Sequence, residues 1–315
     1  LELGNGTRRG HRCREESASV IATRLRPPGR NHVHITHITH SSGLGEWTHS
    51  ECVPESLSGV VEKMWHFEGR MSLLRERSFP RVYSEIILQL GPCFREVDMA
   101  GQSKDFFPQA CFGGATTRPS VIEAPDAVCW VIGIQLHAAG ASLLSRAPAS
   151  EVINATISLD DALGKHAHCL AERCYDAPSV RARFDLVSEF IVQRIATHAY
   201  ADRAISWASA VLRNSNGQSA IGSLQQATSY SKSRFVTLFR EQTGMTPKQY
   251  ARILRFRNSL QLLQQGGRLS DAALMAGYYD QAHMYRDFAE FAQMTPSTWV
   301  QAERFPNSMS LPEAS

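Results

Sequence analysis

The sequence predicts an α+β protein with two domains: a small β-barrel-like N-terminal domain with helices, and an all-α C-terminal domain. Three observations support this. The chain has 315 residues, which is enough for two separate hydrophobic cores. Short strand-like runs separated by Gly and Pro turns occupy its first half. In the last third, apolar residues follow helical spacing, and two blocks repeat at a fixed distance.

The repeat defines the organisation of the C-terminal domain. Residues 244–247 (Gly-Met-Thr-Pro) return 49 positions later as residues 293–296 (Gln-Met-Thr-Pro). Each copy contains a short apolar segment, a polar turn and a second helix that ends before Met-Thr-Pro. Thr246 and Pro247 are favourable N-cap and first-turn residues, and Gly266 follows the next apolar stripe. We therefore predict two helix-turn-helix units joined by a linker helix of about five turns.

The first half is predicted to form the β-barrel-like domain over residues 52–200, followed by a connecting helix and hinge over residues 201–217. The hinge is the polar run Asn214–Gly217. The apolar stripe of helix 184–195 can cover the barrel or pair with a second copy of the chain, and the sequence leaves both interpretations open. The expected strands are 60–67, 82–90, 111–113, 120–123 and 128–136, and the expected helices are 139–144, 150–153, 159–174, 184–195 and 204–212.

Residues 1–50 are expected to be a disordered leader or sequence upstream of the true start, because Gly, Arg, Ser and Pro dominate up to Gly29. His32, His34, His37 and His40 follow, and His-x-His is a spacing found in metal sites. The further carboxylate and histidine that such a site needs do not follow at compatible distances. We therefore predict neither a metal nor a cofactor. Residues 304–315 are expected to be a tail.

The charge distribution distinguishes the two units. The net charge is only +3, but residues 219–257 carry seven Lys and Arg against one acid. Residues 268–304 carry three basic against five acidic residues. A polyanion such as DNA is therefore expected to be held mainly by the first unit, although a merely solvated basic face is the alternative.

The cysteines and the hydropathy of the sequence indicate in which cellular compartment the protein is expected. The seven cysteines are dispersed without a Cys-x-x-Cys pair, which is typical of reduced thiols in a cytosolic protein. The longest apolar run, residues 127–134, is too short to span a membrane, and no signal peptide is visible. We therefore expect a cytoplasmic protein without a membrane partner.

The C-terminal segment resembles the DNA-binding half of AraC/XylS-type transcription regulators. The resemblance covers residues 218–300, and we place the DNA-binding domain at 218–303. Three positions depart from the family pattern, namely Thr237, Ala272 and Gln293, the last standing where a Gly usually ends the second reading helix. The matching residues are Ser231, Phe235, Phe239, Gly244, Tyr250, Arg255, Leu262, Leu263, Ala273, Gly277, Tyr278, Asp280, Gln281, Arg286, Phe288, Thr295 and Pro296.

Residues 52–200 resemble, less specifically, an uncharacterised domain that is often fused ahead of AraC-type halves. The resemblance implies a degenerate cupin-like barrel used for sensing. It does not define the ligand.

The reading helices supply the predicted site residues, because a helix in the major groove presents its N-terminal part to base edges. Arg286 is the leading candidate for a base contact, since Arg bonds bidentately to guanine; the alternative is a surface ion pair with Glu290. Arg255 is expected to form an ion pair between the units. The resemblance and helical spacing imply base contacts from Ser233, Val236, Thr237, Gln281, Ala282, Tyr285 and Arg286, and phosphate contacts from Ser231, Lys232, Arg234 and Arg240.

The predicted function is that of a sequence-specific DNA-binding transcription regulator that is not an enzyme. Its expected partners are double-stranded DNA, RNA polymerase, an unknown small-molecule effector and a second copy in a homodimer. The alternative is a metal-dependent cupin-type enzyme fused to a DNA-binding half. His66 with Glu68, and Cys111 beside two glycines, are the residues an enzyme would use, but their spacing matches no known catalytic arrangement.

Overall fold

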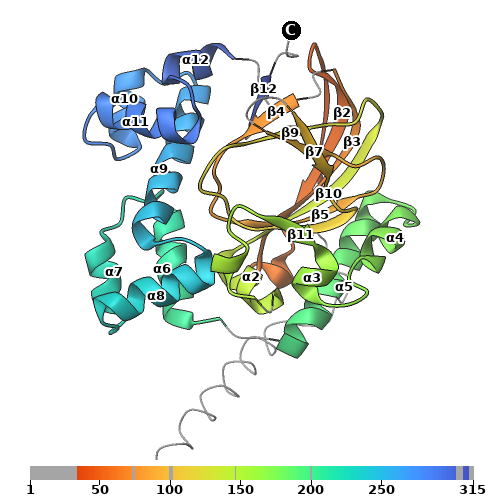
Figure 1. Cartoon of the computed structure of the whole chain (residues 1–315), viewed down its shortest axis with the longest axis horizontal. Coiled ribbons are helices and arrows are strands. Elements are labelled where there is room, and N and C mark those ends of the chain that lie inside the picture. The colour runs from red at the N-terminus through yellow and green to blue at the C-terminus, as the bar shows by residue number, and fades with distance from the viewer. Residues whose placement is uncertain are drawn as a thin grey trace, which may run out of the picture.

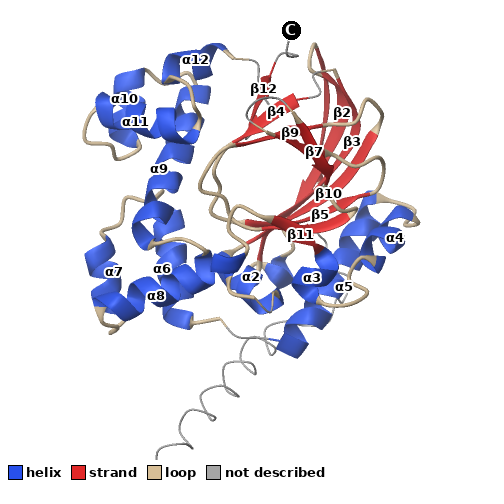
Figure 2. Ribbon diagram, in the orientation of Figure 1, coloured by secondary structure: helices blue, strands red, loops and turns tan. Residues whose placement is uncertain are grey.

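A sheet-rich N-terminal part and a helical C-terminal part lie side by side in the computed structural model (Figure 1; Figure 2). The structure describes residues 34–72, 75–98, 102–145, 147–198, 201–302 and 308–311. The observed architecture confirms the predicted α+β class and its order along the chain.

The strands form two antiparallel sheets that do not close into one barrel. Each predicted strand is present with small shifts at its ends. The larger sheet has the order β1 (Thr36–Ser42), β2 (Gly45–Cys52), β3 (Val61–Met71), β10 (Cys129–Leu136), β5 (Ser84–Gln89), β8 (Ala110–Gly113) and β11 (Thr156–Ser158). The smaller sheet has the order β12 (Ser308–Leu311), β4 (Arg75–Ser78), β9 (Ser120–Glu123), β6 (Arg95–Val97) and β7 (Ser103–Phe106).

Two segments that were expected to lie outside the folded domains take part in the sheets. Residues 36–42 and 45–52 are β1 and β2, which pair with each other and with β3. The interpretation of residues 34–50 as part of a disordered leader is therefore wrong, while residues 1–33 lie outside the described residues. Residues 308–311 of the expected tail pair with β4.

Helices cover one face of the larger sheet (Figure 2). The predicted helix over residues 159–174 is split into α3 and α4, because Gly164 adopts φ 98 after α3. The apolar stripe of α5, including Phe184, Val187 and Ile191, is buried in the core beneath this face, so it covers the sheet and is not a pairing surface. These helices are α2 (Ala138–Leu144), α3 (Leu159–Leu163), α4 (Cys169–Tyr175) and α5 (Val180–His198), with 3-10 turns η1 (Glu55–Leu57) and η2 (Ala149–Glu151).

The C-terminal helices follow the predicted double layout. Helix α9 runs between a lower group and an upper group of helices (Figure 1). The expected connecting helix, α6, is an integral part of the first unit, since its Ile205, Ala208 and Leu212 are fully buried in the same core. The helices are α6 (Arg203–Asn214), α7 (Ile221–Ala227), α8 (Lys232–Thr243), α9 (Pro247–Gln264), α10 (Leu269–Met275), α11 (Gln281–Phe291) and α12 (Pro296–Gln301).

Helix ends in this domain follow from local chemistry. The side chain of Thr246 accepts from Gln249 N, and the Gln249 side chain bonds back to Thr246 N, which completes a capping box at the start of α9. Gly244 ends α8 in the left-handed conformation at φ 80. Its counterpart in the second copy, Gln293, adopts φ 55, so the left-handed geometry is kept without the glycine.

One hydrophobic core spans the boundary between the two parts. Phe79, at the end of β4, packs edge-on against Trp299 of α12 and Phe256 of α9, with ring centroids 5.3 and 6.0 Å away. Arg77 donates to the carbonyl of Ala292 at 3.1 Å, and Ser142 donates to the carbonyl of Gln242 at 3.2 Å. The sheet-rich part therefore contacts both helix-turn-helix units.

Candidate nucleic-acid interface

Helix α8 presents a polar face to solvent at its N-terminal end. Ser231 caps the helix by accepting a hydrogen bond from Arg234 N at 3.3 Å. Phe235, Leu238 and Phe239 are buried on the opposite side, as the spacing predicted. Of the predicted base-contacting residues, Ser233 and Thr237 are exposed and Val236 is half-buried.

The predicted phosphate-contacting residues surround this face. Ser231, Lys232, Arg234 and Arg240 are all exposed. Lys248, at the start of α9, is exposed as well. The first unit thus carries exposed cations beside the polar face of α8, which is an arrangement that attracts a phosphate backbone.

Helix α11 is built in the same way. Asp280 caps it by accepting from His283 N at 2.6 Å. Met284, Asp287, Phe288 and Phe291 are buried, whereas Gln281, Ala282 and Arg286 are exposed and Tyr285 is half-buried against the core.

Arg286 is available for a ligand on this exposed face. Glu290, its alternative partner, is instead bonded by Arg252 of α9 at 2.7 Å. Within the described part of the chain, Arg286 forms none of the ion pairs.

The ion pair that connects the linker helix to the second unit comes from Arg252 and not from Arg255. Arg252 Nη2 lies 2.5 Å from Asp287 Oδ1, and its guanidinium stacks 4.8 Å from the Phe291 ring centroid. Arg255 instead donates to the carbonyl of Gly217 at 3.4 Å, so it holds the hinge before α7. Sequence reasoning missed Arg252, although a carboxylate at position 287 on the apolar side of α11 implies a buried cation partner.

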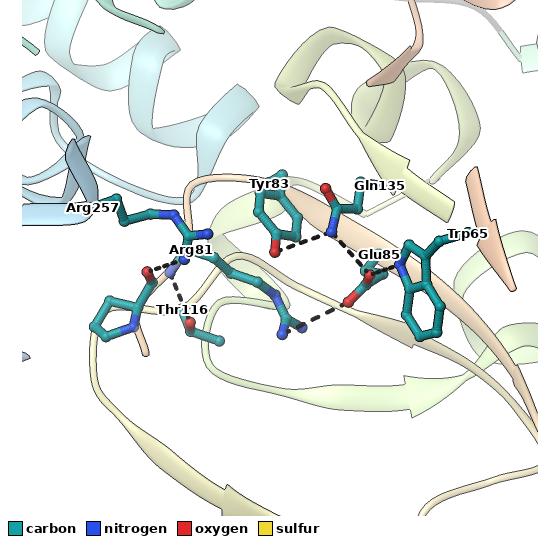
Figure 3. Close-up of polar contacts among 8 residues, drawn as sticks. Trp65, Arg81, Tyr83, Glu85, Thr116, Gln135 and Arg257 are labelled. Carbon is teal, nitrogen blue, oxygen red and sulfur yellow. Dashed lines mark hydrogen bonds and ion pairs between the residues drawn. The ribbon is translucent and has the colours of Figure 1, made fainter. Parts of the chain in front are cut away.

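A cluster of polar side chains lies on the face of the larger sheet that is turned away from its helices (Figure 3). Trp65 Nε1 donates to Glu85 Oε1 at 2.9 Å, and Gln135 Nε2 donates to the hydroxyl of Tyr83 at 3.2 Å. Gly133 is required beside Trp65, because a Cβ there would lie 2.0 Å from the indole. Sequence reasoning did not identify this cluster, since its members come from three separate strands.

The linker helix reaches the edge of this cluster. Arg257 of α9 donates to the carbonyl of Pro80 at 3.2 Å, and its guanidinium carbon lies 5.7 Å from the centroid of the Tyr83 ring (Figure 3). Arg81 lies at the same distance from that ring and 3.9 Å from Glu85. The polar cluster is therefore in contact with the helix that joins the two helix-turn-helix units.

Two of the residues that an enzyme would use, His66 and Cys111, are buried, and Glu68 is half-buried. His66 is buried, burial lowers its pKa to about 4, and its Nε2 lies 3.1 Å from Arg183 Nη1. Cys111 is buried as well, and burial raises its pKa to about 12. Among the residues that the structure describes, no three His, Cys, Asp or Glu side chains are grouped to hold a metal, and no helix is long and apolar enough to cross a membrane.

Two family models match the chain. Residues 224–302 match a helix-turn-helix domain, and residues 52–158 match a domain of unknown function (DUF6597). The chain is 38% identical over 64 residues to the uncharacterized HTH-type transcriptional regulator YbfI of Bacillus subtilis (strain 168), a match that covers 20% of this chain and 23% of the regulator. This chain therefore matches less than a quarter of that regulator's length.

Solved structures resemble this chain at low sequence identity and low TM-score. ToxT from Vibrio cholerae has a TM-score of 0.45 and 11% identity, with 76% of this chain and 98% of ToxT covered. Oxalate decarboxylase from B. subtilis has a TM-score of 0.24 and 13% identity, with 43% and 37% covered. These scores carry no conclusion about ligand or reaction.

The C-terminal part is thus a DNA-binding domain of the helix-turn-helix class, attached to a sheet-rich domain. This match agrees with the resemblance of the C-terminal segment to AraC-type regulators.

Proposed function

We propose that this protein is a sequence-specific transcription regulator that binds duplex DNA through α8 and α11. The observation that carries the proposal is the pair of capped helices, each with buried apolar residues on one side and exposed polar residues at its N-terminal end. Helices with this distribution read base edges in the major groove. The basic first unit supplies the phosphate attraction, and the acidic second unit contributes few but specific contacts.

The N-terminal domain is proposed to sense and not to catalyse. Its contacts to α9 and α12 support a role in which an effector, or association of two copies into a homodimer, changes how the reading helices are held. As part of the same proposal, the protein recruits RNA polymerase and is located in the cytoplasm.

The test is selection of bound duplexes from a random DNA library by the full-length protein. We expect enrichment of sites that contain two short sequence blocks, with affinity that falls steeply as salt rises. Arg234→Ala should weaken binding, whereas Arg173→Ala, an exposed cation on α4, serves as a control without effect. Absence of enrichment, or binding that is insensitive to salt, contradicts the proposal.

A separate metal analysis tests the enzyme alternative. Stoichiometric iron or zinc in the purified protein would favour that alternative.

A further inference from the structure

A thiol, an imidazole and a carboxylate meet on the surface between α3 and α4, far from the proposed DNA contacts in sequence. Gly164 at φ 98 and His166 at φ 67 turn the chain back toward α3. As a result, His168 donates to Asp160 twice: its backbone N lies 2.9 Å from Oδ1, and its ring Nδ1 lies 2.7 Å from Oδ2. Cys169 follows directly and begins α4.

The two hydrogen bonds decide which ring nitrogen of His168 carries the proton. The backbone hydrogen bond from His168, and then the ring hydrogen bond, hold the pKa of Asp160 below its ordinary value. An ionised Asp160 accepts only, so it requires the proton on Nδ1. The unprotonated Nε2 is then the atom that lies 3.6 Å from Cys169 Sγ. A nucleophile, a base and a group that orients the base therefore stand in the order that activates a thiol.

The other described cysteines lack this arrangement. Burial raises the pKa of Cys52 and Cys111 to about 12, and that of Cys129 and Cys174 to about 11. Cys93 is half-buried like Cys169, but burial raises its pKa and no histidine contacts its sulfur among the described residues. Cys93 is therefore a matched reference thiol in the same molecule.

We propose that Cys169 is a site of oxidation by hydrogen peroxide, with His168 as its base and Asp160 as the positioning residue. His168 Nε2 takes the proton of the thiol, and the sulfur attacks one oxygen of the peroxide. An S–O bond forms as the O–O bond breaks, and the departing hydroxide takes the proton back from His168 and leaves as water. The sulfur loses two electrons to give a sulfenic acid, and the peroxide is reduced to water. This proposal does not depend on DNA binding.

The test treats reduced full-length protein with hydrogen peroxide and traps sulfenic acid with dimedone, and peptide mass spectrometry then quantifies Cys169 and Cys93 in the same sample. We expect Cys169 to be labelled at least about tenfold faster than Cys93, because a positioned base contributes at least that much. His168→Gln should bring Cys169 to the rate of Cys93, and Asp160→Asn should lower its rate in part.

A control variant and a second chemical readout distinguish loss of the base from local unfolding. His166→Gln is the matched control, because the His166 ring is exposed and lies 6.3 Å from the His168 ring. Alkylation of Cys169 by iodoacetamide provides the second readout. Local unfolding would expose Cys169 and accelerate alkylation, whereas loss of the base slows it. Equal labelling of Cys169 and Cys93 in the unmodified sequence, or an unchanged Cys169 rate in His168→Gln, overturns the proposal.

Discussion

His66 and His137 are imidazoles whose pKa values are lowered from 6.5 to about 4 by burial. Well above pH 6.5 both rings are neutral in the folded and unfolded chains. As the pH falls below 6.5, the unfolded chain binds protons that the folded chain does not, so the free energy of unfolding should decrease until the pH reaches about 4. The loss should be on the order of 2–3 kcal/mol for each ring.

Denaturant titrations between pH 7 and pH 4 measure this loss. His66→Gln should reduce the dependence of the free energy of unfolding on pH without abolishing it, because His137 and His49, whose pKa values burial also lowers, still titrate in the variant. A slope that is the same in both proteins would show that His66 is not held neutral by the fold.

Substitution of Arg286 tests whether α8 and α11 make different contributions to DNA binding. Arg286→Ala should relax the preference at one base-pair position, at a cost of about 1–3 kcal/mol for the preferred base. Arg240→Ala should weaken binding to all sequences alike, since a phosphate contact carries no sequence information. Competition between matched and mismatched duplexes separates these effects. Equal loss of specific and non-specific binding in Arg286→Ala would refute the assignment.

At the scale of elements, the joint between α9 and α11 depends on one buried carboxylate. The Asp287 side chain is 1% exposed and is bonded by Arg252, whereas the Glu290 side chain is 57% exposed. Arg252→Met leaves Asp287 buried without its counter-charge and should lower the free energy of unfolding by about 3–5 kcal/mol. Glu290→Gln removes only an exposed partner and should cost less than about 1 kcal/mol. Chemical denaturation compares the two, and similar costs would show that burial of Asp287 is not decisive.

The two Met-Thr-Pro turns begin with different residues, Gly244 in the first and Gln293 in the second, so each residue can be tested in the other's position. Gln293 adopts φ 55 with a side chain, so Gln293→Gly should raise the free energy of unfolding by about 0.5–1 kcal/mol. Gly244→Gln should act in the opposite direction and more strongly, because a Cβ there would also approach the Ala149 carbonyl to 3.0 Å. Thermal melts of both variants measure the effects, and destabilisation by Gln293→Gly would contradict the cap argument.

Helices and strands could be predicted from the sequence where their own side chains show a local pattern of burial or capping. The apolar runs of β5 and β10 and the caps of α8 and α9 were read correctly because burial and capping chemistry are local. Strand β1 was missed because an edge strand keeps most of its side chains in solvent and shows no apolar alternation. The pairing of β12 with β4 joins main-chain atoms of segments that are far apart in the sequence, and it leaves no pattern in the sequence.

The same limit applies to the candidate site. Helical spacing and the family resemblance placed the exposed faces of α8 and α11, because both follow from local sequence. The contacts of Arg252 with Asp287 and of Arg257 with Pro80 depend on how α9 packs against segments 35 and 177 residues away. Only the tertiary structure brings these groups together.

At the scale of the whole molecule, Phe79 connects the two domains. It is 1% exposed and lies against Trp299 and Phe256, so Phe79→Ala should cost about 3–5 kcal/mol and uncouple the helical domain from the sheets. Calorimetry should show one transition in the unmodified protein and two in the variant. Phe106→Ala is the control, because Phe106 is 64% exposed. A single, equally shifted transition in both variants would argue against coupling through Phe79.

Helix α9 also has a consequence for the nucleic acid. Its 18 residues span about 27 Å; the capping box fixes the N-terminal end, and the bonds of Arg252 and Arg257 hold the first half and the middle. One turn of B-DNA spans about 34 Å and about 10 base pairs, so each inserted base pair rotates one contacted block by roughly 35° relative to the other. We therefore expect a chain with a rigid α9 to be sensitive to the length of the DNA between its two contacted blocks, even where no side chain reads the bases.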